Sequence, residues 1–171
     1  MSITYPRFEA CIRCSAGVLF DLVADMPRYH RWLPGSEAFG GTRDVLPYPV
    51  QKGTTYLDFG PAGERPGQVT EYDPPAHLGF HQTMKVRLGP LTADIDINVH
   101  YTFTQEGDST HVLRALELSL ETPGLARLLA PLIRHKFNVE NRRILTALKD
   151  YAERQSTGLD ESRLHSHQPP S

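Results

Sequence analysis

The chain has 171 residues, of which 39% are hydrophobic and 22% are charged, and this composition is typical of a single globular domain. Its 18 basic and 20 acidic side chains give a formal net charge of -2, which excludes the positive field that dedicated nucleic-acid binding needs. Two cysteines cannot make the disulfide framework of a small secreted domain, no signal-like leader opens the sequence, and no apolar run reaches the length of a membrane span, so we expect a cytoplasmic protein.

The N-terminal region predicts one strand followed by two short helices. Apolar and polar residues alternate over residues 7–14, as in a half-buried strand. Ser15 is suited to cap a helix, and the apolar residues that follow recur at helical spacing: Ala16, Leu19, Phe20 and Val23. Pro27 then opens a second short helix, which Pro34 and Gly35 end.

The middle of the chain predicts an antiparallel meander. Gly, Pro and Asp punctuate residues 36–121 into six short extended segments. The clearest alternation covers residues 91–104, whose apolar face comprises Leu91, Ala93, Ile95, Ile97, Val99, Tyr101 and Phe103. A turn at Gly107 and Asp108 then predicts a hairpin between the last two strands.

The C-terminal region predicts one long amphipathic helix. After Pro123, apolar residues recur with the helical period of about 3.6 as far as Tyr151. The opposite face carries more Lys and Arg than Asp and Glu, and is therefore locally basic. Residues 156–171 are polar, lack periodicity and contain Pro169 and Pro170, which predicts a disordered tail after a single domain over residues 1–155.

This order of elements predicts an α+β fold with an internal cavity. One sheet of about seven strands must cover its apolar face, and only the C-terminal helix is long enough to do so. A strongly twisted sheet curls, and a straight helix cannot fill the whole concave side of a curled sheet. We therefore expect the order β-α-α-β6-α, with a pocket between sheet and helix that the two short helices close at one end.

Four stretches of the chain carry a resemblance to a known superfamily. Residues 15–25 read SAGVLFDLVAD and residues 27–34 read PRYHRWLP, residues 73–80 read DPPAHLGF, and residues 141–149 read NRRILTALK. Together, over roughly residues 5–154, they resemble the START-like (SRPBCC) superfamily, which includes polyketide cyclase/dehydrase and lipid-transport proteins. The resemblance implies a helix-grip fold and an internal ligand cavity, in families that include aromatase/cyclases, quinone and lipid carriers, and plant hormone receptors.

The candidate cavity residues come from the resemblance and from register. The superfamily places an aromatic residue at the pocket mouth where this chain has Trp32. Register on the predicted strands and helix adds the residues expected to face inward: Phe59, Tyr72, Phe80, Gln82, Met84, Arg114, Phe137 and Asn141. For the apolar members ordinary core packing is the alternative. For Arg114 the alternatives are a side chain that reaches solvent at a strand end and a β-bulge that reverses the register.

The polar candidates are the more informative. Gln82 and Arg114 share apolar strand faces, and Asn141 lies on the apolar side of the helix. An unpaired polar group in such a place costs roughly 1–3 kcal/mol, so a pocket containing water or a ligand oxygen would satisfy it.

Other patterns in the sequence carry no predicted chemistry. Cys11 and Cys14 have C-x-x-C spacing but lie on a strand, where odd spacing sends the two thiols to opposite faces. His77 and His81 share a face with no carboxylate placed to complete a metal site, so we predict no metal. Asp94 and Asp96 belong to a solvated strand face, and no phosphate loop or nucleophile elbow is present.

The sequence therefore predicts a module that binds a small hydrophobic ligand, resembling a lipid, a quinone or a polyketide, without a cofactor. A cofactor-independent aromatase/cyclase-type enzyme acting on a polyketide-like substrate is the alternative, because this fold hosts both functions. The basic helix face also allows a weak peripheral contact with an anionic membrane.

Overall fold

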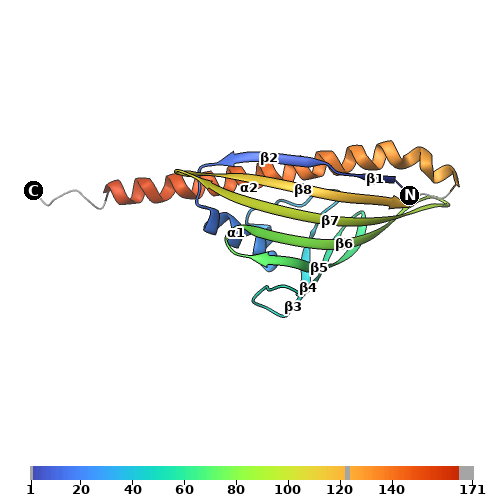
Figure 1. Cartoon of the computed structure of the whole chain (residues 1–171), viewed down its shortest axis with the longest axis horizontal. Helices are drawn as coiled ribbons and strands as arrows, with labels where there is room; N and C mark the ends of the chain where they lie inside the picture. The colour runs from blue at the N-terminus through green and yellow to red at the C-terminus, as the bar shows by residue number, and fades with distance from the viewer. Residues whose placement is uncertain (1, 122–123, 166–171) are drawn as a thin grey trace, which may run out of the picture.

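The computed structural model describes residues 2–121 and 124–165, which form one curved sheet and a set of helices (Figure 1). The strands are β1 (Ser2–Thr4), β2 (Arg7–Ile12), β3 (Gly41–Leu46), β4 (Thr55–Gly60), β5 (Gly63–Asp73), β6 (His77–Leu88), β7 (Leu91–Glu106) and β8 (Ser109–Glu121). The helices are α1 (Ala16–Ala24), the 3-10 helices η1 (Met26–Arg31) and η2 (Gly124–Leu129), and α2 (Ala130–His165).

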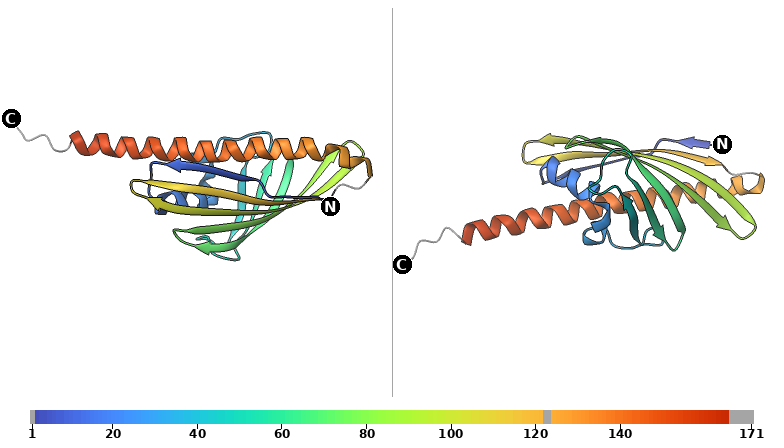
Figure 2. Two further views of the ribbon diagram at one scale, coloured as in Figure 1. Left: turned by 45° about the horizontal axis from the view of Figure 1, so that its top comes forward. Right: turned by 90° about the horizontal axis from the view of Figure 1, so that it is seen from below.

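The sheet is antiparallel throughout, in the order β1-β8-β7-β6-β5-β4-β3, and β2 also pairs with β8. The strands β1 and β2 follow one another along the same edge of β8, so β1 adds a short strand to the seven that the sequence predicts. The helix α2 runs straight across one face of the curved sheet, and its last turns extend beyond the sheet (Figure 2). The predicted architecture, a curved antiparallel sheet against a long C-terminal helix, is confirmed.

Strict alternation places the core between the sheet and α2. On β7 every second side chain from Ala93 to Phe103 is buried, as predicted. On β8 the buried face includes two polar side chains, Thr110 and Arg114. The helix contributes buried side chains at helical spacing: Ile133, Asn141, Leu145, Leu148 and Ala152.

The helix α1 fills one end of the space beneath the sheet. The Ser15 side chain caps it by accepting a hydrogen bond from the Val18 backbone N–H at 3.4 Å, as predicted. Its predicted apolar stripe is buried, and the Phe20 ring packs edge-on against Tyr72 and Phe103 at 5.3 and 5.9 Å between ring centroids. This end of the interior is therefore occupied by aromatic rings.

The C-terminal helix continues beyond its predicted end. The sequence predicts a disordered tail from residue 156, but α2 continues to His165, while residues 166–171 lie outside the described residues. Residues 156–165 contain no proline, and Ser156 and Thr157 bond to the carbonyl oxygens one turn earlier, each at 3.0 Å. These contacts are compatible with a continuing helix, which hydrophobic periodicity does not reveal. In the described part of the chain, no helix combines the length and the apolarity that crossing a membrane requires.

Candidate ligand-binding site

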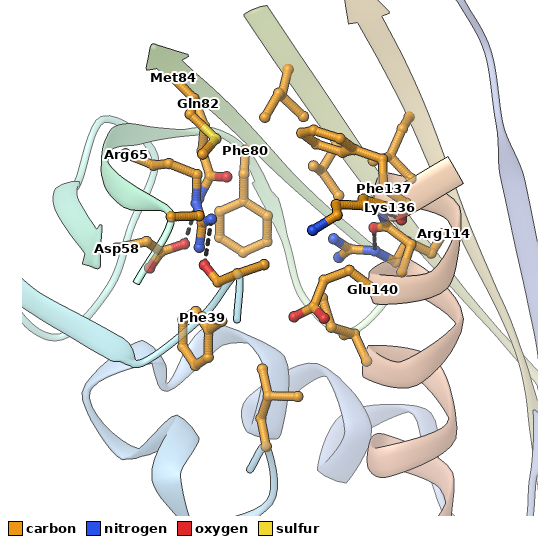
Figure 3. Close-up of a pocket in the computed structure, with 18 of the residues that line it drawn as sticks. Phe39, Asp58, Arg65, Phe80, Gln82, Met84, Arg114, Lys136, Phe137 and Glu140 are labelled. Carbon is orange, nitrogen blue, oxygen red and sulfur yellow. Dashed lines mark hydrogen bonds between the residues drawn. The ribbon is translucent and has the colours of Figure 1, made fainter. Parts of the chain in front are cut away.

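A cavity of about 420 Å³ lies between the sheet and α2 (Figure 3). This volume falls within the range of about 300–1,000 Å³ that is typical of small-molecule sites. Most of its wall is apolar, with the sheet contributing Phe80, Ile97, Val99 and Leu116 and the helix contributing Phe137 and Ile144. The cavity therefore suits a molecule with a hydrophobic body.

The exposed lining residues locate the mouth of the cavity. They are Pro61 and Ala62 in the β4–β5 turn, Arg87 near the end of β6, and Leu132 and Lys136 on the first turns of α2. The mouth therefore lies between the tips of two hairpins and the beginning of α2, at the other end from α1. Two of its five residues are cationic.

A fixed guanidinium group forms the first polar pole of the cavity. Arg114 is only 9% exposed, and its Nε donates a hydrogen bond to the Asn141 side-chain oxygen at 2.7 Å. Its Nη1 donates to the Tyr101 hydroxyl oxygen, and the guanidinium lies 4.8 Å from the centre of the Tyr101 ring. Asn141 is itself held by a hydrogen bond from its side-chain nitrogen to the Phe137 carbonyl oxygen at 2.7 Å. Arg114 is thus oriented by its neighbours and still lines the cavity.

A buried carboxyl group forms the second polar pole. Asp58 is 7% exposed, and its two oxygens accept hydrogen bonds from the Thr42 hydroxyl at 2.5 Å and from the Gln82 amide at 2.6 Å. The same Gln82 nitrogen lies 3.0 Å from the Tyr56 hydroxyl oxygen. Figure 3 places this group on the opposite side of the cavity from Arg114.

A glycine allows the second pole to form. Gly67 pairs with Tyr56 across β4 and β5, and a Cβ at this position would lie 2.4 Å from the Tyr56 ring. Only a residue without a side chain lets the Tyr56 ring lie across β5 and reach Gln82.

Burial raises the pKa of Asp58 at the second pole and of Tyr101, which lies beside Arg114 at the first. Loss of hydration raises the pKa of the Asp58 carboxyl, and the hydrogen bonds from Thr42 and Gln82 offset only part of that effect. Loss of hydration also raises the pKa of the Tyr101 hydroxyl, against the opposing charge of Arg114. Tyr101 therefore remains a neutral phenol, whose oxygen accepts from Arg114 and whose O–H keeps the capacity to donate.

One side of the cavity is held in place by the polar side of α2. Arg143 binds both carboxyl oxygens of Glu140 at 2.7 and 3.0 Å and donates to the Pro34 carbonyl oxygen at 2.7 Å. Glu140 in turn accepts from the Ser36 hydroxyl at 2.9 Å. Partial burial raises the pKa of the Glu140 carboxyl, but the hydrogen bonds from Arg143 and Ser36 outweigh it, so the net pKa is lowered. These contacts hold the segment that carries Phe39 against the helix.

Comparison with known proteins identifies the fold. No protein-family model matches the sequence, and no curated protein matches it. A START superfamily protein from Mycobacterium smegmatis superposes with a TM-score of 0.60 over 88% of this chain and 98% of its own, at 13% identity. The chain has a START-like helix-grip fold.

Two further solved structures share the START-like fold. CalU16 from Micromonospora echinospora gives a TM-score of 0.55 at 15% identity, over 95% of this chain and 84% of its own. DynU16, a protein of the dynemicin biosynthetic locus, gives a TM-score of 0.56 at 18% identity over 87% of this chain. The chain spans only 47% of the length of DynU16. At these identities the likeness concerns the fold alone.

Within the START-like fold, seven of the nine predicted site residues line the cavity: Trp32, Phe80, Gln82, Met84, Arg114, Phe137 and Asn141. Trp32 is buried, and its indole N–H donates to the Leu22 carbonyl oxygen at 3.1 Å, so it supplies an apolar surface and no free donor. The predicted alternative for Arg114, a side chain reaching solvent, is wrong, because it is buried between Tyr101 and Asn141.

The other two predicted residues, Phe59 and Tyr72, do not line this cavity. Phe59 lies on the outer face of β4, where the Arg43 guanidinium lies 5.3 Å from its ring centre. Alternation on β4 places Tyr56 and Asp58 inward, so Phe59 must point outward. Tyr72 does not line the cavity, because Phe20 of α1 covers its ring.

The acidic pole at Asp58 was not predicted from the sequence. Assigning Phe59 to the inner face of β4 automatically placed Asp58 on the outer face, so a single register error removed the buried carboxyl from view. Tyr101 was predicted to be buried, but only as part of an apolar face. A signal for Asp58 was present in its spacing from Tyr56, because residues two apart on a strand share one face and burial of the Tyr56 ring carries Asp58 inward with it.

No metal-binding cluster accompanies the site. The described residues include no group of three or more His, Cys, Asp or Glu side chains arranged to hold an ion. His81 lies outside the cavity, where it pairs with Asp96 at 2.8 Å. Cys11 is exposed and Cys14 is buried, as expected for thiols that point in opposite directions.

Proposed function

We propose that the chain binds a small hydrophobic molecule that carries at least one oxygen atom able to accept hydrogen bonds. Its apolar body would lie against the wall formed by Phe80, Val99 and Phe137, with its oxygen at Arg114. The observation that supports this proposal is a guanidinium group that is buried, already oriented by Asn141 and Tyr101, and directed at an apolar cavity.

The energetics favour a bound oxygen at this place. Burying a cation is costly unless hydrogen bonds and opposite charge compensate for the lost hydration. Arg114 has five N–H donors, and its bonds to Asn141 and Tyr101 use only part of that capacity. A ligand carboxylate, phenolate or carbonyl oxygen would accept hydrogen bonds from the remaining N–H groups. Because Arg114 is already oriented, its side chain would lose little conformational entropy on binding.

A probe of this chemistry tests the proposal. Calorimetric titration of the wild-type protein with 2-naphthoate, a flat aromatic acid, should show binding of one molecule per chain. Substituting Val99→Phe, which enlarges a buried side chain of the cavity wall, should weaken this binding at least about tenfold because the cavity loses volume. The matched control is Val139→Phe, which makes the same change at an exposed position of α2.

The proposal is contradicted if the wild-type protein does not bind the acid, or if Val99→Phe and Val139→Phe leave the same affinity. Circular dichroism of both variants verifies that the fold survives. Native mass spectrometry of the purified wild-type protein then shows whether an organic molecule of similar size accompanies it.

A cyclase-type enzyme is the second candidate, and the acidic pole favours it. An enolisable polyketone bound in the cavity would place a carbonyl oxygen near Arg114 and Tyr101, whose N–H and O–H groups can stabilise an enolate. Asp58 would then serve as the group that removes or returns a proton at carbon. Conversion of a poly-β-ketone into a cyclic product, rather than its reversible binding, distinguishes this candidate from a carrier.

We also propose that the mouth of the cavity makes a weak contact with anionic membranes. Leu128 and Leu132 are 78% and 48% exposed, and the cations Arg87 and Lys136 lie at the same mouth. Exposed leucines beside basic side chains suit a surface of anionic headgroups over an apolar interior. A lipid-like ligand could then pass between bilayer and cavity without crossing water.

Vesicle co-sedimentation tests this contact. Vesicles containing phosphatidylserine should retain the wild-type protein at low salt and release it at high salt, and pure phosphatidylcholine should retain little. Substituting Leu128→Asp should lower the bound fraction about tenfold because a leucine inserted into the membrane is replaced by a charge. Leu46→Asp, at a position 68% exposed on β3, is the matched control. Equal loss in both variants, or no retention of the wild-type protein, contradicts the contact.

A further inference from the structure

The cavity has two polar poles separated by an apolar middle. Asp58 lies on β4 and Arg114 on β8, and the rings of Phe80 and Phe137 belong to the wall between them (Figure 3). Both polar groups are at least nine-tenths buried and both line the cavity. A ligand anchored only at Arg114 would leave the acidic pole facing an apolar surface.

The acidic pole retains unused capacity for hydrogen bonds. A carboxyl group that is ionised offers about four acceptor sites, and the bonds from Thr42 and Gln82 occupy two of them. Both of these donors are uncharged, and although the charges of Arg65 and Arg114 also act on the carboxyl, its pKa remains raised by the loss of hydration. A donor on the ligand would therefore compensate for part of the hydration that Asp58 loses on burial.

The surroundings of Asp58 select the kind of donor. Arg65 lines the same side of the cavity, where its Nη1 donates to the Ala38 carbonyl oxygen at 2.6 Å. Its positive charge repels a cationic group on the ligand, whereas a neutral hydroxyl is not repelled. The Tyr56 hydroxyl next to Gln82 can also bond to a second hydroxyl group.

We infer that the ligand is a two-ended molecule, with an acceptor oxygen at Arg114, a hydroxyl group donating to Asp58, and a flat apolar body between them. This inference rests on the proposed function and narrows it to hydroxylated aromatic or polyketide-like compounds. Asp58 is a ligand-binding residue in this arrangement, and Gln82 and Thr42 are positioning residues that hold its carboxyl group.

Three matched pairs of aromatic acids of increasing length test the inference. They are benzoate and 4-hydroxybenzoate, 2-naphthoate and 6-hydroxy-2-naphthoate, and biphenyl-4-carboxylate and 4′-hydroxybiphenyl-4-carboxylate. In the pair whose length spans the two poles, the hydroxylated acid should bind the wild-type protein about tenfold or more tightly than the plain acid. The reason is that its hydroxyl group forms a hydrogen bond to the charged carboxyl of Asp58. Binding is measured by calorimetry at a mildly alkaline pH, where the carboxyl is ionised.

The variant Asp58→Asn removes the charge and keeps the shape. It should reduce the gain from the hydroxyl, measured within the variant as the ratio of affinities for the two acids of a pair, to about threefold or less, because a neutral acceptor makes a weaker bond. Asp94→Asn is the matched control, since Asp94 is exposed on the other face of the sheet. This control variant should keep the full gain in affinity that the hydroxyl group gives.

The outcomes separate the two proposals. If no acid of any length binds the wild-type protein, the proposed function fails and this inference fails with it. If the plain acids bind but no hydroxyl improves binding, or if Asp58→Asn keeps the full gain, the cavity binds hydrophobic acids and only the two-ended ligand is overturned.

Discussion

Replacing Arg114 with methionine is expected to weaken the binding of 2-naphthoate about 30-fold. The variant loses a charge-assisted hydrogen bond to the carboxylate, which contributes roughly 1.5–3 kcal/mol, while methionine keeps most of the apolar stem of the arginine. Calorimetric titration of the wild-type protein and the variant at the same pH measures the change.

An uncharged probe distinguishes this loss from damage to the cavity. Naphthalene has the same body without the carboxylate, so its affinity should change by less than about threefold in Arg114→Met. Equal weakening of the acid and the hydrocarbon would show that the cavity had collapsed and that Arg114 is not the anchor.

The same substitution should have two opposed effects on the stability of the fold. It leaves the Asn141 side-chain oxygen and the Tyr101 hydroxyl without their donor, which destabilises the fold. It also removes a cation that is 9% exposed, which stabilises the fold because that charge no longer has to be desolvated. These opposed effects should keep the free energy of unfolding within about 2 kcal/mol of the wild-type value.

Regular elements with one apolar face could be predicted from the sequence. The alternation on β7 predicted its buried face residue by residue, and the spacing from Ala16 to Val23 predicted the stripe that α1 buries. In both cases one period dominates, and burial of apolar surface decides which side faces inward. The polar residues Arg114 and Asn141 stood out for the same reason, because each interrupts an otherwise apolar face.

The inward-facing residues of a strand could not be predicted where both of its faces carry polar as well as apolar side chains. Each face of β4 carries apolar and polar side chains, so alternation alone could not decide whether Asp58 or Phe59 points inward. In β5 an irregularity in pairing between Val69 and Glu71 breaks the alternation on which the placement of Tyr72 depended. Such shifts are set by pairing with the neighbouring strands, which no single segment encodes.

The poles themselves depend on contacts between distant segments. Arg114 on β8 is oriented by Asn141 on α2, and Asp58 on β4 is held by Thr42 on β3 and Gln82 on β6. The sequence identified some of these groups as buried polar residues, but the distances between them follow from the curvature of the sheet and from where α2 crosses it (Figure 2). The curvature of the sheet and the path of α2 also determine the volume of the cavity.

The stability of the unliganded Asp58→Asn variant, relative to that of the wild-type protein, should increase with pH. Burial raises the pKa of the Asp58 carboxyl in the folded state above its value in the unfolded chain, which is about 3.9. Between these two pKa values the folded wild-type protein binds more protons than the unfolded chain, so its free energy of unfolding falls as pH rises. Asparagine does not titrate, so the free energy of unfolding of the variant does not fall with pH for this reason.

The size of the effect follows from linkage. The difference in free energy of unfolding between Asp58→Asn and the wild-type protein should rise from about pH 4 to the folded-state pKa and then remain constant, gaining about 1.4 kcal/mol for each unit by which the pKa is raised. Urea unfolding of both proteins at a series of pH values measures it, with Asp94→Asn as the exposed control.

A difference that stayed flat or fell with pH would mean that the carboxyl ionises as readily in the folded protein as in the unfolded chain, and the acidic pole would lose its physical basis. A rising difference would mean that the protein retains a carboxyl group that lowers its own stability at neutral pH. A ligand group that binds the ionised carboxyl would offset this cost. A hydroxylated ligand should accordingly stabilise the wild-type protein more than it stabilises the variant.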